Sequence, residues 1–310
     1  MGAARLLRGL VEVVPPQNVE VVVNTGDDVV LHGLHISPDL DTVTYTLAGV
    51  VPPERGWGLQ GETWEVMAAL DRYATVAPPG SGAAATWFRL GDRDLATHLY
   101  RTHRLAEGAP LSTVTAEVAR AWGVDVVLRP MTDDPVATVM GVAEGEIGFQ
   151  DYFVRRRHSV AVTGVRFAGA DAARPGPGVL EALWRADVIV ICPSNPIVSV
   201  GPILAVPGLR PALEARREAT VAVSPIVAGA ALKGPADRLM AELGYEVSVV
   251  GVARLYAPLA ATLVVDTADA PLAPAVEDAG MRCVVTPAVM HGVPEAAALA
   301  EAVLAAGRGR

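Results

Sequence analysis

The sequence predicts an α/β protein with a Rossmann-like, doubly wound and mainly parallel sheet, a helix-rich insertion and a small hairpin. Short apolar runs alternate with amphipathic stretches along the 310 residues, the pattern of a parallel sheet covered by helices on both faces. Hydrophobic residues make up 51% of the chain, enough for a large core. Acidic turns follow apolar runs, at the strand ends where open α/β sheets bind their ligands.

Seven apolar runs are expected to be strands, separated by stretches with helical periodicity. They span residues 19–23, 124–128, 160–165, 188–192, 221–223, 263–265 and 283–286. Residues 188–191 have no polar side, so we expect a central strand there.

Helix starts are also signalled. Ser37, Pro38 and Asp39 supply a cap, a first-turn proline and an acid. A second helix is expected after Pro110. Strand-like stretches flank Glu144-Gly145-Glu146, which predicts a hairpin between about residues 136 and 154. We therefore divide the chain into a Rossmann-like core, residues 1–60 and 156–310, and an insertion, residues 61–155.

Charge and composition exclude several classes of protein. The net charge of -9 argues against nucleic-acid binding and suits a site that needs a cation. Cys192 and Cys283 lie in apolar runs and are expected to be free thiols in a reducing compartment, the cytoplasm. We find no segment typical of an export signal or a membrane span. The single lysine, Lys233, follows Leu232, which excludes a Walker P-loop.

Aspartates carry the strongest chemical signal. Asp27 and Asp28 leave the strand at 19–23, and Asp39 and Asp41 open the next helix. Carboxylates held about 4 Å apart repel by roughly 4 kcal/mol at an effective dielectric near 20, so a cation is expected between them. Oxygen ligands favour Mg²⁺ or Ca²⁺ over zinc. Alternatively, Asp39 and Asp41 only decorate a helix start.

The histidines are expected to lie in loops, on solvated surfaces or in local packing and not to be metal ligands. His32 and His35 lack a third nitrogen or sulfur ligand nearby, and His98 and His103 suit a solvated helix face or local packing.

Two further stretches place polar groups for a ligand. In Gly91-Asp92-Arg93-Asp94 the acids suit a helix start, whereas Arg89 and Arg93 suit phosphate or a polar ring. After residues 188–192, the stretch from Pro193 to Pro202 carries Ser194, Asn195 and Ser199 at another strand end. No glycine-rich dinucleotide fingerprint follows a strand, which disfavours hydride transfer.

The first helix stands without a strand before it. Residues 2–10 are expected to be helical, whereas a doubly wound sheet begins with a strand and a glycine-rich turn. We expect that the start was assigned one strand too late, for example at an internal GTG codon. Two neighbouring strands would then lack a partner, and the protein would be poorly stable or inactive. Upstream DNA without an in-frame strand and glycine pair would contradict this.

Taken together, these motifs resemble the 2-phospho-L-lactate transferase family, called CofD in archaea and FbiA in actinobacteria. The resemblance covers nearly the whole chain and rests on the order of six motifs. They are the helix from Gly2, Asn24 to Asp28, Ser37 to Thr42, Gly91 to Asp94, Phe149 to Tyr152, and Pro193 to Pro202.

The resemblance implies transfer of a phospholactyl or enolpyruvyl-phosphoryl group from a GDP-linked three-carbon acid to the ribityl hydroxyl of FO, a deazaflavin. GMP leaves, and the product is the precursor of coenzyme F420. It implies FO contacts at Asp41 and Arg89, beneath the insertion, and Mg²⁺ at Asp27, Asp28 and, with less support, Asp39. For nucleotide binding we expect Gly2, Asn24, Ser194, Asn195 and Ser199; for catalysis, Asp41 as proton acceptor and Arg93 as the arginine that orients the transferred group.

Two other readings stay open. A regulatory protein of the related YvcK type would bind a nucleotide sugar without catalysis, and an NAD-dependent dehydrogenase is a more distant third. The sequence does not distinguish phospholactate, phosphoenolpyruvate and phosphoglycerate donors. A homodimer is the expected assembly, with small-molecule substrates and neither nucleic acid nor membrane as partners.

Overall fold

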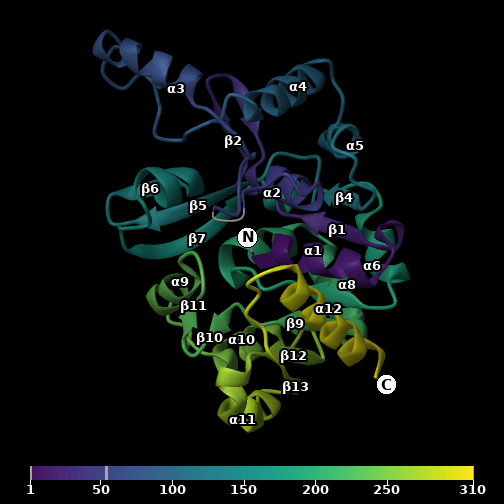
Figure 1. Cartoon of the computed structure of the whole chain (residues 1–310). Helices are drawn as coiled ribbons and strands as arrows, with labels where there is room; N and C mark the ends of the chain where they lie inside the picture. The colour runs from purple at the N-terminus through teal and green to yellow at the C-terminus, as the bar shows by residue number, and fades with distance from the viewer. Residues whose placement is uncertain (1, 53–54, 310) are drawn as a thin grey trace.

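The main sheet is parallel and lies between two layers of helices, as predicted (Figure 1). The computed structural model describes residues 2–52 and 55–309. Four strands, in the order β13-β12-β9-β8, form the sheet: β8 (Ile189–Ile191), β9 (Thr220–Val223), β12 (Thr262–Val265) and β13 (Arg282–Val285). All three pairings are parallel, and Leu263 stands opposite both Ala222 and Cys283.

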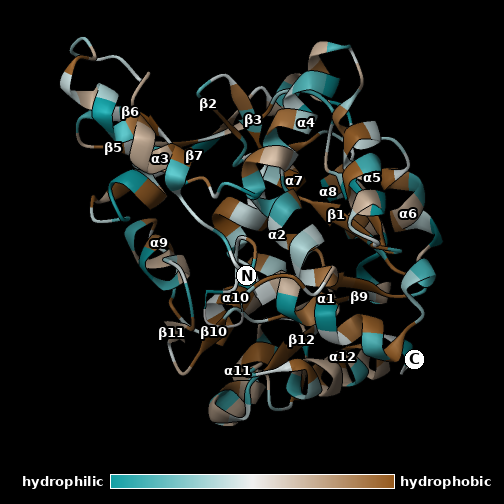
Figure 2. Ribbon diagram, turned by 45° about the horizontal axis from the view of Figure 1, so that its top comes forward, coloured by the Kyte–Doolittle hydropathy of each residue, from teal (hydrophilic) through white to brown (hydrophobic). Residues whose placement is uncertain are grey.

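Alternate residues of β9 show why helices cover both faces. Val221 and Val223 pack with α1 (Gly2–Val13) and α12 (Val293–Arg308), whereas Ala222 packs with α8 (Leu209–Ala215) and α10 (Val249–Tyr256). All four β9 residues are buried, and Figure 2 shows these strands as hydrophobic. Burial on both faces favours the unbroken apolar runs seen in the sequence.

Helices α1 and α12 lie side by side, although they come from opposite ends of the chain (Figure 1). A Cβ on Gly9 would lie 2.1 Å from a backbone atom of Ala296. The missing side chain therefore lets the two helix backbones touch.

A second parallel pair stands apart from this sheet. Strand β1 (Glu20–Val23) pairs with β4 (Val127–Pro130), with Val21 opposite Leu128. Within residues 2–52 and 55–309, β1 pairs only with β4 and β8 only with β9. The prediction that residues 188–191 form a central strand is therefore wrong for the described chain.

A three-stranded antiparallel sheet holds the predicted hairpin. Strands β5 (Ala137–Val142) and β6 (Gly145–Gly148) form it, and β7 (Val162–Ala168) pairs with the other side of β5. The run at 160–165 is thus a strand, but placing it in the parallel sheet was wrong. Apolar periodicity does not report strand direction, so the sequence could not make this distinction.

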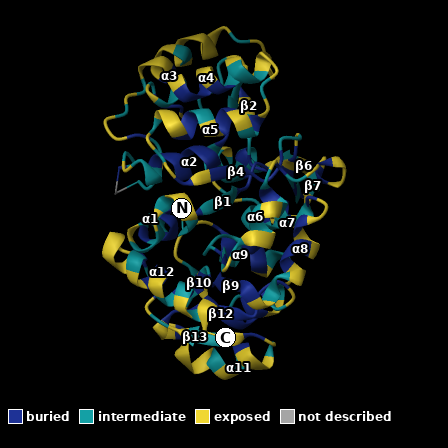
Figure 3. Cartoon of the chain, turned by 90° about the vertical axis from the view of Figure 1, so that its right-hand side faces the viewer, coloured by how far each residue is buried: buried dark blue, intermediate teal, exposed yellow. Residues whose placement is uncertain are grey.

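The remaining elements surround these three sheets. Figure 1 shows α3 (Glu65–Leu70), α4 (Asp94–Ala106) and α5 (Leu111–Ala121) together with the hairpin strands β2 (Val29–Leu31) and β3 (Leu34–Ile36) at one end. Buried residues concentrate under the helices, and the outer faces of α3 and α11 are exposed (Figure 3). The others are α2 (Pro38–Leu47), α6 (Val179–Arg185), α7 (Gly201–Ala205), α9 (Ala236–Glu242), α11 (Ala273–Asp278), β10 (Ile226–Val227) and β11 (Ala230–Ala231).

Candidate functional site

The turn that follows β1 brings the first acids to the start of α2. Asn24 organises it: its Oδ1 accepts a hydrogen bond from the Gly26 amide at 2.7 Å, and its Nδ2 donates to Asp39 Oδ2 at 3.0 Å. Asn24 is itself buried. One side chain thereby joins the loop after β1 to the first turn of α2, as the predicted cation site requires.

Asp27 and Asp39 interact closely, and no positively charged side chain of residues 2–52 and 55–309 forms an ion pair with either of them. Burial raises the pKa of Asp27 well above its usual range, and the Asp39 carboxylate raises it further, against the opposing effect of Thr138. Burial also raises the pKa of Asp39. Oδ1 of Asp27 is buried and has no hydrogen-bond partner among the described residues. A buried, unpaired carboxylate of this kind is costly unless a cation meets it.

Asp28 is held more firmly by its neighbours. Its Oδ2 accepts from Ser37 Oγ at 2.6 Å and lies 2.9 Å from His35 Nε2. Burial raises the pKa of Asp28, and His35 and Ser37 oppose that rise. The prediction that Ser37 caps α2 with its side chain is wrong: Ser37 holds the N-cap position, but its hydroxyl bonds Asp28.

Asp41, on the next turn of α2, is paired with an arginine that the sequence analysis missed. Arg101 of α4 donates to both Asp41 oxygens, at 3.1 Å from Nη1 to Oδ2 and also from Nη2 to Oδ1. Both residues are buried, Arg101 at 2% exposure. Before it could accept a proton from a substrate, Asp41 would have to give up part of this pair.

His98 joins the same cluster and is buried rather than solvated. Its Nδ1 lies 3.7 Å from Asp41 Oδ2 and its Nε2 3.3 Å from Asp94 Oδ2. Burial alone would raise the pKa of Asp94, but His98 and Tyr45 outweigh burial and the pKa is lowered. His98 is thus packed locally, which is one of the two predicted alternatives, and its neighbours are two carboxylates.

Asp41, Asp94 and His98 form a group that could hold a metal ion, because one ligand atom from each lies within 4.8 Å of the others. However, Arg101 already supplies a positive charge to Asp41, and the Tyr45 hydroxyl donates to Asp94 at 2.6 Å. Within the part of the chain that the structure describes, no arginine or lysine side chain pairs with Asp27 or Asp39 in this way.

The residues around Asp27 and Asp39 fit a hard divalent cation. Four buried side-chain oxygens without hydrogen-bond partners lie in the turn after β1 or on the strand β5 that contacts this turn. They belong to Thr25, Asp27, Asp28 and Thr138. Elsewhere in the described chain such atoms are scattered. Oxygen-only donors suit Mg²⁺ rather than zinc.

The loop after β8 faces the same region. Asn195 Oδ1 caps a π-helical turn at Pro196–Val200 by accepting from the Ile197 amide at 2.9 Å. From that turn, the carbonyl of Val198 accepts from Asn24 Nδ2 at 3.5 Å. The backbone amide of Ser199 donates to the Asn195 carbonyl, and that of Ser194 to the Cys192 carbonyl. Within helices, π turns are frequent at functional sites.

Gly2 also lies in this region, because a Cβ there would lie 2.2 Å from the Pro193 carbonyl oxygen. The start of α1 and the loop after β8 are therefore in backbone contact. Among the predicted nucleotide residues, the described contacts join Gly2 to Pro193 and Asn24 to the turn after Asn195.

The predicted arginines lie in the insertion, and no described contact joins them to the acids. Arg89 lies over the Trp64 ring at 5.5 Å, and Arg93 donates to the Gln60 carbonyl at 2.6 Å. Both are exposed. Asp92 caps a different helix from the one expected, because it accepts from the Glu65 and Val66 amides at the start of α3.

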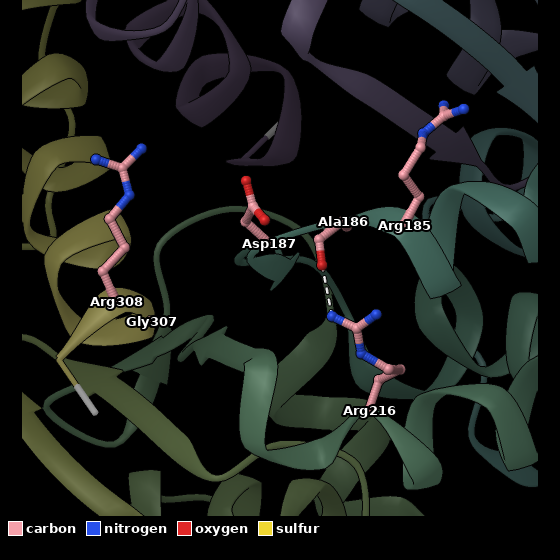
Figure 4. Close-up of a pocket in the computed structure, with 6 residues that line it drawn as sticks. All are labelled: Arg185, Ala186, Asp187, Arg216, Gly307 and Arg308. Atoms are coloured by element: carbon pink, nitrogen blue, oxygen red, sulfur yellow. Dashed lines mark hydrogen bonds between the residues drawn. The ribbon is translucent and has the colours of Figure 1, made fainter.

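A separate hollow lies at the amino end of β8. It measures about 420 Å³ and is lined by Arg185, Asp187, Arg216 and Arg308 among others. Figure 4 shows the Arg216 guanidinium bonded to the Ala186 carbonyl, with Arg185 pointing away from it. Arg185 itself pairs with Glu20. These two arginines are thus occupied by structural bonds, and the hollow is distant from the acids along the strand.

Both cysteines are free, as predicted. None of the described helices has the length and apolar character needed to cross a bilayer by itself; only the bent pair formed by Pro196–Ala205 and Leu209–Ala215 meets those criteria together.

A Rossmann-like sheet with buried carboxylates at a strand end defines a class of phosphate-handling proteins, and comparisons agree. The family model described as 2-phospho-L-lactate transferase CofD matches residues 1–283. The chain belongs to this family, and so is a phosphotransferase of coenzyme F420 biosynthesis.

Similar relatives span nearly the same length. The phosphoenolpyruvate transferase of Streptomyces griseus subsp. griseus is 46% identical, over 98% of this chain and 95% of its own. The phosphoenolpyruvate transferase of Kitasatospora aureofaciens is 44% identical, over 98% and 94%. A solved protein of Bacillus halodurans shares the fold at a TM-score of 0.60 and 18% identity, covering 98% of this chain and 96% of that one.

Proposed function

We propose that the protein transfers a phosphoryl group bearing a three-carbon acid from a GDP-linked donor to the ribityl hydroxyl of FO, releasing GMP. The donor acid is phospholactate or phosphoenolpyruvate; the names of the similar relatives favour phosphoenolpyruvate. The observation that carries the proposal within this chain is the Asp27–Asp39 pair at the end of β1: Asp27 is buried, its Oδ1 has no hydrogen-bond partner, and no positively charged side chain of the described residues pairs with either carboxylate.

Asp27 and Asp39 would hold Mg²⁺, with Asp28 fixed beside them by His35 and Ser37. When bound, the ion supplies charge neutralisation for the phosphate oxygens and for the leaving GMP. Asn24 holds the two acid segments in register through its hydrogen bonds to Gly26 and Asp39. Asp27 and Asp39 then need no rearrangement to face the same cation.

The nucleotide is proposed to lie between Gly2 and the loop carrying Ser194, Asn195 and Ser199. The close approach of Gly2 to Pro193 leaves no side chain between helix α1 and this loop. The start of α1 suits an anion, because a helix amino terminus carries partial positive charge.

FO is proposed to contact Asp41 and Arg89 beneath the insertion at residues 61–155. We propose Asp41 as acceptor of the hydroxyl proton, which requires that the substrate displace part of the Arg101 pair. Arg93 is proposed to orient the transferred group, which requires that its bond to the Gln60 carbonyl be exchanged for the substrate. A homodimer in the cytoplasm is the assembly and location that we propose.

The test is mass spectrometry of the product formed from FO with each candidate GDP-linked donor in the presence of Mg²⁺. We expect a product with one donor at least, and a loss of 100-fold or more in turnover for Asp27→Asn, about the loss seen when one charge-stabilising group is removed from an active site. Asp266→Asn is the matched control, because Asp266 also follows a strand but its oxygens accept from the Ala268 and Ala288 amides. We expect it to lower stability and to keep the turnover of the folded protein.

The regulatory alternative is separated by binding. Fluorescence titration with FO should show saturable binding, and UDP-sugars should not compete with it. Binding of UDP-sugars alone, with no turnover for any donor, would replace the transferase proposal by the regulatory one.

A further inference from the structure

The antiparallel sheet holds the Gly26–Asp27 turn from a part of the chain more than a hundred residues away. The Thr138 amide of β5 donates to the Gly26 carbonyl at 2.6 Å. The Gln150 side chain donates to the Asp27 carbonyl at 2.9 Å, and it is buried. The carbonyls of Gly26 and Asp27 are thus held by β5 and by the segment between β6 and β7.

The hydroxyl of Thr138 lies against the same turn. Thr138 is 2% exposed, and its Oγ1 has no hydrogen-bond partner of good geometry among the described residues. A Cβ on Gly26 would lie 2.9 Å from this oxygen, so the hydroxyl occupies the space that a side chain would need. Asp27 Oδ1 is also buried and unpartnered.

The Thr138 hydroxyl lies against the Gly26–Asp27 turn, and neither it nor Asp27 Oδ1 has a hydrogen-bond partner among the described residues. Leaving both oxygens unpaired is costly. The hydroxyl can donate and the carboxylate can accept, so a bond between the two would satisfy both. A hydroxyl bonded in this way would fix which carboxylate oxygen points toward Asp39.

We propose that Thr138 is a positioning residue of the cation site: its amide fixes the turn, and its hydroxyl orients the Asp27 carboxylate so that one oxygen faces a divalent cation. This inference rests on the proposed function, since it assumes that Asp27 is a cation ligand. Partners that orient a ligand typically contribute 10- to 100-fold to metal affinity.

The test measures Mn²⁺ binding to the whole free protein by electron paramagnetic resonance, so that no turnover is needed. Thr138→Val keeps the shape and the backbone amide but removes the hydroxyl, and we expect Mn²⁺ affinity to fall about 10-fold or more. Thr138→Ser restores a hydroxyl and should keep affinity within about 3-fold of wild type, well short of that effect. A purely structural role would instead penalise the serine, which loses the methyl group.

Thr262→Val is the matched control. Thr262 is also a buried strand threonine, 1% exposed, whose hydroxyl has no partner, but it opens β12 at the end opposite the acids. We expect its Mn²⁺ affinity to equal that of wild type.

A second variant covers the case in which Thr138→Val fails to fold. Gly26→Ala would press a methyl group against the Thr138 hydroxyl and the Asn24 Oδ1, at 2.9 and 3.1 Å, and should weaken Mn²⁺ binding similarly. If Thr138→Val or Gly26→Ala binds Mn²⁺ as wild type does while Asp27→Asn does not, Thr138 has no positioning role and the cation site stands. If Asp27→Asn also binds normally, the cation site itself is wrong.

Discussion

Removing Arg101 should destabilise the fold severely, because the Asp41 carboxylate would remain buried without its partner. Asp41 is 5% exposed and Arg101 is 2% exposed, and the guanidinium donates to both carboxylate oxygens. Removing one member of a buried ion pair typically costs about 3–5 kcal/mol. In Arg101→Met we expect a loss of about 3 kcal/mol or more.

The measurement is thermal unfolding followed by circular dichroism at neutral pH. A loss of about 3 kcal/mol corresponds to a fall on the order of 6–10 °C in the midpoint. Asp41→Asn in the same chain should recover part of the loss, since it removes the stranded carboxylate.

Arg166→Met is the matched control, because Arg166 makes an equivalent two-pronged pair with Glu146 at the surface. Exposed pairs contribute little, so we expect no measurable change. Equal effects of Arg101→Met and Arg166→Met would show that the buried pair does not hold α4 against α2. They would favour the alternative that Asp41, Asp94 and His98 bind a metal ion.

Three further predictions concern regions outside that pair. Burial alone would raise the pKa of Asp266, but hydrogen bonds from the Ala268 and Ala288 amides lower it. The ionised Asp266 therefore contributes its full stabilisation of the fold above the unfolded pKa near 3.9. That contribution is lost as the pH falls through the lower pKa of the folded state. Urea unfolding should show a large gap between wild type and Asp266→Asn at pH 7 and a shrinking gap below about pH 4. Hydrogen exchange should be slowest in β9, which has partners on both sides, and faster in β1 and β8; equal protection in all three would contradict the split between them. Asp92→Ala should expose α3 to protease while the core stays folded, because the carboxylate caps that helix; an unchanged cleavage pattern would contradict this.

The sequence predicted those features that depend on neighbours in the chain. Strand positions followed from apolar runs, and all seven runs contain a strand, although the run at 124–128 is displaced toward β4 at Val127–Pro130. The start of α2 was predicted from Pro38 and Asp39, and the hairpin from Glu144-Gly145-Glu146. These signals are local, so they survive without knowledge of the tertiary fold.

Features that depend on distant partners could not be predicted. Arg101 bonds Asp41 from 60 positions away, and Thr138 reaches Gly26 from 112. A basic residue in the middle of an amphipathic helix has the same local pattern whether it faces water or a buried carboxylate. Only the helical spacing of His98 and Arg101 placed them on one face of α4, and that spacing is common on solvated helices.

The two acid clusters near α2 differ in one respect that decides their roles. Asp41 has its cation within the chain, since Arg101 of α4 donates to both of its oxygens. Asp27 and Asp39 lie on the neighbouring turn, and among the described side chains only neutral donors such as Asn24 and Thr138 contact them. Burial without an internal counter-charge costs stability in the free protein, and that cost is recovered only when a cation binds. A divalent ion should therefore stabilise wild type but not Asp27→Asn, and it should leave the effect of Arg101→Met unchanged.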